Sequence, residues 1–158
     1  MKAFARAATL ALLFAASTAY ADIAGRVVGV IDGDTLDVLV DKRPVRVRLA
    51  QIDAPEKRQA FGTRARQALA SLAFRQDVTV IEAGPDRYGR TVGTVYVGVV
   101  NVNNELVRQG MAWAYRRYVT DPAVIQIEAE ARREKRGLWV DPSPVPPWEY
   151  RHQSAAAR

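Results

Sequence analysis

The chain has 158 residues, of which 49% are hydrophobic and 25% charged, proportions that fit one globular domain with an apolar core. Its 23 basic residues outnumber its 17 acidic ones, and this excess favours a polyanionic partner such as nucleic acid. It has no cysteine and a single histidine, His152, which excludes disulfides, thiolate chemistry and zinc sites of the usual Cys/His kind.

Residues 1–21 have the pattern of a secretory signal peptide. Lys2 and Arg6 precede an apolar run at 7–16, and Ala19-Tyr20-Ala21 supplies the small residues of a cleavage site. A buried N-terminal helix and a membrane anchor are the alternatives, but for an anchor the run is shorter than the about 20 apolar residues that cross a bilayer. We expect cleavage after Ala21, export to the periplasm or the medium, and no membrane association afterwards. The mature chain then keeps 21 basic against 17 acidic residues.

Three strands are expected next. Residues 23–31 are mostly β-branched or glycine and end at Asp32-Gly33, a dipeptide that favours tight turns. Residues 35–40 and 45–49 alternate between apolar and polar side chains, which is typical of strands with one buried face. Arg48 is expected on the face that points away from the core. Pro55 prevents further pairing after the third strand.

A helix is expected at 62–75, where apolar residues recur at helical spacing, and two further strands at 78–81 and 91–97. The order of three strands, one helix and two strands is that of the OB-fold, a five-stranded Greek-key barrel.

Two more helices are expected, one at 103–113 and one that begins at Asp121-Pro122 and is stopped by Gly137. The predicted fold class is therefore α+β, a five-stranded OB-fold barrel with three added helices over residues 22–140. Residues 141–158 are rich in proline and then polar, and are expected to form an extended tail.

Two short acidic patches are candidates for a cation site. Asp32-Gly33-Asp34-Thr35 is a weak signal alone, because aspartates are common at turns and the spacing does not match an EF-hand loop. A second patch, Asp53-Ala54-Pro55-Glu56, follows a strand that neighbours the first patch. Three carboxylates can then converge at one end of the barrel, which is costly unless a cation or bound protons neutralise them. Oxygen ligands favour a hard ion such as calcium or magnesium.

Arginines lie beside these acids in the sequence. Arg48 precedes the second patch, and Arg87 and Arg90 belong to the turn Asp86-Arg87-Tyr88-Gly89-Arg90. They could simply pair with surface acids. Guanidinium groups also present paired donors that match phosphate oxygens and stabilise the charge that develops on phosphorus.

Four motifs occur in order: IDGDT, RLAQIDAPE, DRYGR and ELVRQGMAWAY. Together they resemble the signatures of the staphylococcal-nuclease-like family, also called thermonucleases, and the resemblance spans residues 28–139. It implies an OB-fold barrel with added helices. It also implies a secreted, calcium-dependent enzyme that cleaves single-stranded DNA and RNA as well as duplex DNA and leaves a 5′-hydroxyl and a 3′-phosphate.

The resemblance also implies roles for individual residues. Calcium would be held by the carboxylates of Asp34 and Asp53 and by the backbone carbonyl of Ala54. Glu56 would orient the attacking water or accept its proton. Arg48 and Arg90 would bind the scissile phosphate. Nucleotide contacts are expected from Arg87, Tyr115 and Tyr118, with aromatic rings that stack on bases.

The chain differs from the family pattern at three points. Ala54 replaces a usual threonine, the loop at 57–60 is short, and the tyrosine spacing in AWAYRRY leaves open which ring stacks on a base. Two other functions remain open: an OB-fold module that binds nucleic acid without cutting it, and a secreted calcium-stabilised binder of sugar or protein. The sequence implies no obligate protein partner.

Overall fold

The computed structural model describes residues 22–156, so the predicted signal peptide lies outside the described residues. The strands are β1 (Ile23–Val30), β2 (Thr35–Val40), β3 (Arg43–Leu49), β4 (Ile52–Asp53), β5 (Asp77–Pro85), β6 (Thr91–Val97), β7 (Val100–Asn101) and β8 (Trp113–Ala114). The helices are α1 (Gly62–Ala73), α2 (Val102–Arg108), α3 (Ala123–Arg133) and α4 (Pro147–Ala156), with 3₁₀ turns η1 (Arg116–Tyr118) and η2 (Gly137–Val140).

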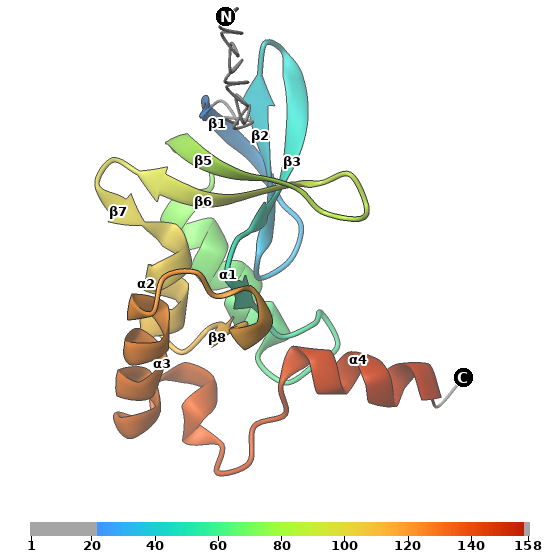
Figure 1. The fold of residues 1–158 in the computed structure, drawn as a ribbon, viewed down its shortest axis with the longest axis vertical. Helices are drawn as coiled ribbons and strands as arrows, with labels where there is room; N and C mark the ends of the chain where they lie inside the picture. The colour runs from blue at the N-terminus through green and yellow to red at the C-terminus, as the bar shows by residue number, and fades with distance from the viewer. Residues whose placement is uncertain (1–21, 157–158) are drawn as a thin grey trace, which may run out of the picture.

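Five strands form a closed barrel, the upper part of the molecule in Figure 1. β1, β2 and β3 make an antiparallel meander, β5 pairs with β1, and β6 pairs with β5. A parallel pairing of β3 with β6 closes the ring. The strand order and closure confirm the predicted OB-fold.

The barrel interior is filled by the apolar residues of the alternating strands. Fully buried side chains come from every barrel strand, namely Val27, Leu36, Val38, Val47, Val80 and Val95. α1 and α2 extend this core with Ala65, Leu69, Leu106 and Val107, which belong to the same apolar cluster. The helices α1, α2 and α3 gather below the barrel, while α4 lies apart at the lower right (Figure 1).

Asn103 links α2 to the barrel through three hydrogen bonds. Its side-chain oxygen accepts the N–H of Val95 at 3.0 Å, and its amide nitrogen donates to the carbonyls of Ala50 at 3.0 Å and Gly93 at 3.2 Å. The residue is 2% exposed, so these bonds satisfy polar groups that water does not reach.

Helix boundaries differ from the predicted ones. α2 ends at Arg108 rather than continuing to 113, because Gly110 adopts a φ of 67° that turns the chain. Trp113 and Ala114 then form β8, which pairs with β4. α3 ends at Arg133, before the left-handed Lys135, whose φ is 53°.

The extended tail that the sequence predicted is partly helical. Residues 147–156 form α4, so the fold has four added helices within residues 22–156 rather than three. Pro147 is the first residue of α4, a position that proline favours, and Glu149 lies in the first turn, where a negative charge interacts well with the helix dipole. No helix in the described part of the chain is long and apolar enough to span a membrane.

Candidate active site

Asp34 lies in the loop that joins β1 to β2 and is only 6% exposed. Its Oδ2 accepts a hydrogen bond from the backbone N–H of Ala54 at 2.6 Å. Gly33 lets this loop approach closely, since a Cβ at that position would lie 2.7 Å from the Cβ atoms of both Ala54 and Ala65. The glycine of the Asp-Gly pair is therefore needed for packing, which holds the Asp34 carboxylate against the end of β4.

Asp53 is the last residue of β4 and is 1% exposed. Its position is fixed by the pairing of β4 with β8, in which Asp53 lies opposite Trp113. Ala54 is also buried, at 4% exposure. The first and second acidic patches thus meet at one end of the barrel, as the sequence predicted for Asp34 and Asp53.

Arg48 joins the two aspartates. Its Nη1 lies 2.5 Å from Oδ2 of Asp34, and its Nη2 donates to Oδ1 of Asp53 at 2.9 Å. The side chain is 15% exposed, whereas Arg46, on the same face of β3, is 52% exposed and pairs with Asp37. Arg48 lies on the face of β3 that points away from the apolar core, yet its side chain is covered. The two acidic patches lie over this end of β3 and bind its guanidinium.

Burial and neighbouring charges shift the pKa values of Asp34 and Arg48. Burial raises the pKa of Asp34 to about 7; Arg48 opposes this shift, and the charges of Asp32 and Asp53 add to it. Burial lowers the pKa of Arg48, but the charges of Asp34 and Asp53 outweigh it and raise the pKa above its ordinary value. Arg48 therefore stays charged beside two buried carboxyl groups.

The residues present fit a hard divalent cation. Asp34 and Asp53 converge closely enough for one guanidinium to bind both, and every side-chain donor is an oxygen. Within residues 22–156 no group of three or more Asp, Glu, His or Cys residues gathers as a metal site, so Glu56 does not join the two aspartates as a third ligand. The fit therefore rests on two carboxylates and on the expected Ala54 carbonyl.

Glu56 lies beside this pair at the surface. Its side chain is 40% exposed, and its Oε1 accepts a hydrogen bond from Nη1 of Arg151 at 2.8 Å. Its backbone packs against the start of α1, where Gly62 leaves the necessary space, because a Cβ there would lie 1.9 Å from the Glu56 carbonyl oxygen. A partly exposed carboxylate next to two buried ones can accept a proton from water.

Arg151, from α4, is part of this group although the sequence did not point to it. Its Nη2 donates to Oδ2 of Asp53 at 2.8 Å and its Nη1 to Oδ1 at 3.2 Å, in addition to the bond with Glu56. Burial lowers the pKa of Arg151, but the hydrogen bonds to Asp53 and Glu56 outweigh it and raise the pKa.

The two predicted base-stacking tyrosines lie together. The rings of Tyr115 and Tyr118 meet edge to face with centroids 4.8 Å apart, and Tyr118 is 55% exposed. Trp148 of α4 stacks on Tyr115 at 5.3 Å with the ring planes 4° apart. One face of Tyr115 is thus covered by the same helix that carries Arg151.

Arg90 and Arg87 lie in the β5–β6 loop, which leads into the strand that pairs with β3. Arg90 donates from Nε to Oδ2 of Asp86 at 2.7 Å, and Arg87 is exposed over the Tyr88 ring at 4.8 Å. Among the described residues no ion pair joins Arg90 to Asp34, Asp53 or Glu56. The structure brings Arg48 into the acidic group and leaves Arg90 paired within its own loop.

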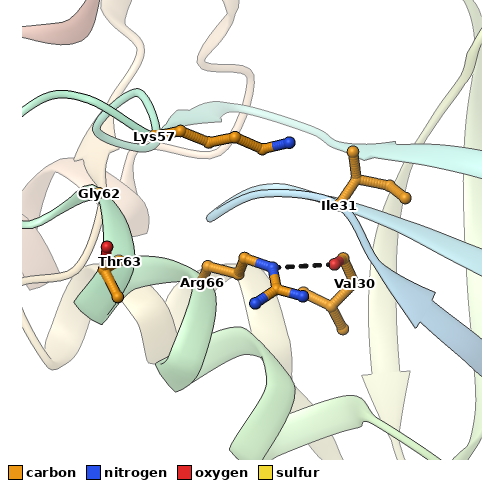
Figure 2. A pocket seen from close by; sticks show the side chains of 6 residues that line it. All are labelled: Val30, Ile31, Lys57, Gly62, Thr63 and Arg66. Atoms are coloured by element: carbon orange, nitrogen blue, oxygen red, sulfur yellow. Dashed lines mark hydrogen bonds between the residues drawn. The ribbon is translucent and has the colours of Figure 1, made fainter.

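An open pocket adjoins the acidic loop, where Lys57 and Arg66 extend from opposite sides toward the end of β1 (Figure 2). Arg66 donates from Nε to the Val30 carbonyl at 3.1 Å. The pocket is lined by Val30, Ile31, Lys57, Gly62, Thr63 and Arg66. Two cationic side chains thus flank a hollow whose lining residues Lys57 and Ile31 are the sequence neighbours of Glu56 and Asp32.

Comparison with known proteins agrees with this geometry. Residues 46–141 match the family model described as staphylococcal nuclease homologue. The chain belongs to the staphylococcal nuclease family. It is 57% identical to Protein ParB of Escherichia coli over 94% of this chain and 90% of that one. It is 50% identical to a micrococcal nuclease of Shigella flexneri over 95% of this chain and 92% of that one. An uncharacterized endonuclease of Escherichia coli O157:H7 is 50% identical over 84% and 88%.

The family match begins within β3, after Asp34, and ends after η2, before α4. It includes Arg48, Asp53, Glu56 and Arg90. Arg151 and Trp148 were missed because the proline-rich stretch suggested an extended tail. A usable signal was present: Pro147 can start a helix, and Trp148 and Arg151, three residues apart, then share one helix face.

Proposed function

We propose that this member of the nuclease family is an exported, calcium-dependent endonuclease that hydrolyses phosphodiester bonds of DNA and RNA and leaves 3′-phosphate ends. The observation that carries this proposal is the convergence of the buried Asp34 and Asp53 on one guanidinium, with Glu56 beside them. Comparison with endonucleases at 50% identity supports the reaction class.

Asp34 and Asp53 would hold the calcium ion, with the Ala54 carbonyl as a further oxygen ligand. Bound there, calcium supplies positive charge that stabilises the negative charge gained by the phosphate. The buried position of both carboxylates strengthens this attraction, because water screens it little.

Glu56 acts as the general base. It accepts a proton from a water molecule whose oxygen forms a new bond to phosphorus, while the bond from phosphorus to the 5′ oxygen breaks. The 5′ oxygen takes up a proton and leaves as a hydroxyl, and the phosphate stays on the 3′ side. The exposure of Glu56 gives water access to its carboxylate.

Arg48 stabilises the transition state. Its Nη1 and Nη2 each have one carboxylate partner, and a guanidinium has five N–H donors, so donors remain for phosphate oxygens. Arg90 would provide a second guanidinium, and to do so it must turn from Asp86 toward the substrate. Its side chain is 32% exposed, which leaves room for such a rotation.

The substrate would run along the cationic and aromatic surface around the acids. Tyr115 and Tyr118 offer faces for bases, Arg87 offers a positive charge, and the pocket flanked by Lys57 and Arg66 can take the negatively charged backbone (Figure 2).

The experiment is cleavage of single-stranded DNA, duplex DNA and RNA by the purified protein in calcium or in EDTA. Cleavage in calcium, none in EDTA, and products that require phosphatase before 3′ extension are expected. Binding without calcium-dependent cleavage would instead identify a non-catalytic OB-fold module. Mass spectrometry of the exported protein tests the predicted signal-peptide cleavage, with Asp22 expected at the N-terminus.

A further inference from the structure

The C-terminal helix α4 contacts both the acids and an aromatic ring of the proposed site. Arg151 and Trp148 are three residues apart and so lie on one face of the helix. Arg151 binds Asp53 and Glu56, and Trp148 stacks on Tyr115. One short helix thus covers an acid assigned to calcium, the assigned base and a ring assigned to a nucleobase.

Arg151 and a calcium ion would need the same atoms. The guanidinium binds both carboxylate oxygens of Asp53, and Arg48 shares Oδ1. These bonds take three of the roughly four acceptor sites of the carboxylate, so a cation coordinated by Asp53 competes with the guanidinium groups. Arg48 is 15% exposed and belongs to a barrel strand, whereas Arg151 is 42% exposed and belongs to α4. Arg151 is the partner that can leave at the smaller cost.

Trp148 and a nucleobase would also compete. The Trp148 ring lies parallel to Tyr115, the arrangement that a stacked base would adopt. Tyr115 also meets Tyr118, edge to face. A base that stacks on the covered face of Tyr115 must therefore displace Trp148.

The attachment of α4 is weak enough for release. The helix has ten residues, and helices of this length have marginal stability in water without packing partners. Apart from Pro147, its residues are half-buried or exposed. Trp148 meets Trp113 edge to face at 5.6 Å, and the preceding segment is held by a hydrogen bond from Gln59 to the Val145 carbonyl at 2.6 Å.

We propose that α4 is an intrinsic strap over the active site, in which Arg151 competes with calcium for Asp53 and Trp148 competes with a nucleobase for Tyr115. Calcium and a nucleic-acid strand release the strap, and the docked strap lowers the apparent affinity for both. This inference rests on the site assignment of the proposed function.

The size of the effect follows from the population of the docked form. If α4 is docked in about 90% of molecules, the apparent Kd for calcium is about ten-fold weaker than that of the open form. Linkage is reciprocal, so calcium bound at the site must in turn weaken α4 docking.

The first measurement is calcium binding by titration calorimetry, without nucleic acid, on the full chain. Arg151→Gln is expected to bind calcium several-fold more tightly than wild type, and Arg151→Lys, which keeps the charge but loses the paired donors, to lie between them. Arg133→Gln is the matched control: it removes the same charge from an exposed position with no ion pair in the described structure. Unchanged or weaker binding by Arg151→Gln would overturn the proposal.

The second measurement is hydrogen exchange of wild type, followed by mass spectrometry. Peptides from α4 should exchange faster when calcium is added, and faster still with a phosphorothioate-linked oligothymidine, while peptides from α1 stay unchanged. Equal or slower exchange in α4 would show that the helix stays in place and would refute the strap.

The two proposals fail in distinguishable ways. Suppose that wild type cleaves in calcium, α4 exchanges at the same rate with and without calcium, and Arg151→Gln has an unchanged Kd for calcium. This result supports the nuclease and refutes the strap. If calcium releases α4 but the protein binds strands without cutting them, the strap is supported and the nuclease activity is refuted.

Discussion

The Asp34 carboxylate accepts the backbone N–H of Ala54 at 2.6 Å and so ties the β1–β2 loop to the end of β4. Asp34→Asn keeps a side-chain oxygen that can accept this bond, and the barrel should fold. The change removes a ligand charge, so calcium affinity and cleavage should fall together. Calorimetry and a cleavage assay check this, and unchanged calcium affinity would show that Asp34 is not a ligand.

Glu56→Gln tests the general base. Loss of such a group typically lowers turnover by about 10²–10⁴-fold. Calcium affinity and strand binding should persist, because the glutamate is assigned to the water rather than to the ion. Turnover near that of wild type would remove Glu56 from the mechanism.

Lysine substitutions test the arginines. Arg48→Lys and Arg90→Lys should each lower turnover tens-fold or more, since loss of one transition-state donor costs about 2.7–4 kcal/mol in comparable sites and lysine lacks paired donors. Arg46→Lys is the control, because Arg46 lies on the same strand and pairs with Asp37 at the surface. If all three variants have equal rates, neither Arg48 nor Arg90 stabilises the transition state.

Tyrosine substitutions test base stacking. Tyr115→Ala and Tyr118→Ala should raise the Michaelis constant on single strands more than they lower turnover, because stacking acts in ground and transition states alike. Binding should also weaken steeply with salt as counterions are released. A Michaelis constant that neither change moves would assign both rings to structure.

The pKa of Asp34 gives a pH dependence of stability. Folding raises this pKa from 3.8 to about 7, mainly through burial, with Asp32 and Asp53 adding to the shift and Arg48 opposing it. Between these values the folded state holds a proton that the unfolded state has lost, so the contribution of Asp34 to stability falls as pH rises through this range. Urea unfolding in EDTA should show that the free energy of unfolding of wild type, minus that of Asp34→Asn, falls as pH rises from about 4 to about 7. A difference that rises with pH would contradict the shift.

The barrel could be predicted from local sequence patterns. Alternating apolar residues in the strands and the turn residues between them fix the meander, and the strand at 91–97 was placed at its observed bounds. The same patterns placed Asp34 and Asp53 at one end of the barrel, because each follows or ends a strand of known direction.

The sequence could not give the contacts that depend on distant segments. Nothing local to Asp53 indicates that Arg151, 98 residues away, binds it. The family motif implied that Arg90 binds the scissile phosphate, but it did not indicate the pairing of Arg90 with Asp86, four residues earlier in the same loop. Helix ends were missed at 110 and 135, where positive φ values turn the chain.

The short β4–β8 ladder has a consequence for the order in which the site can form. Asp53 lies opposite Trp113, so the segment that carries it has no strand partner until the chain beyond residue 112 has been made and has folded back. Contacts of such sequence separation form late, since the loop between them must first be closed. The chain can therefore complete most of its barrel while one of the two carboxylates proposed to bind calcium is still unplaced, so the proposed site is complete only near the end of folding.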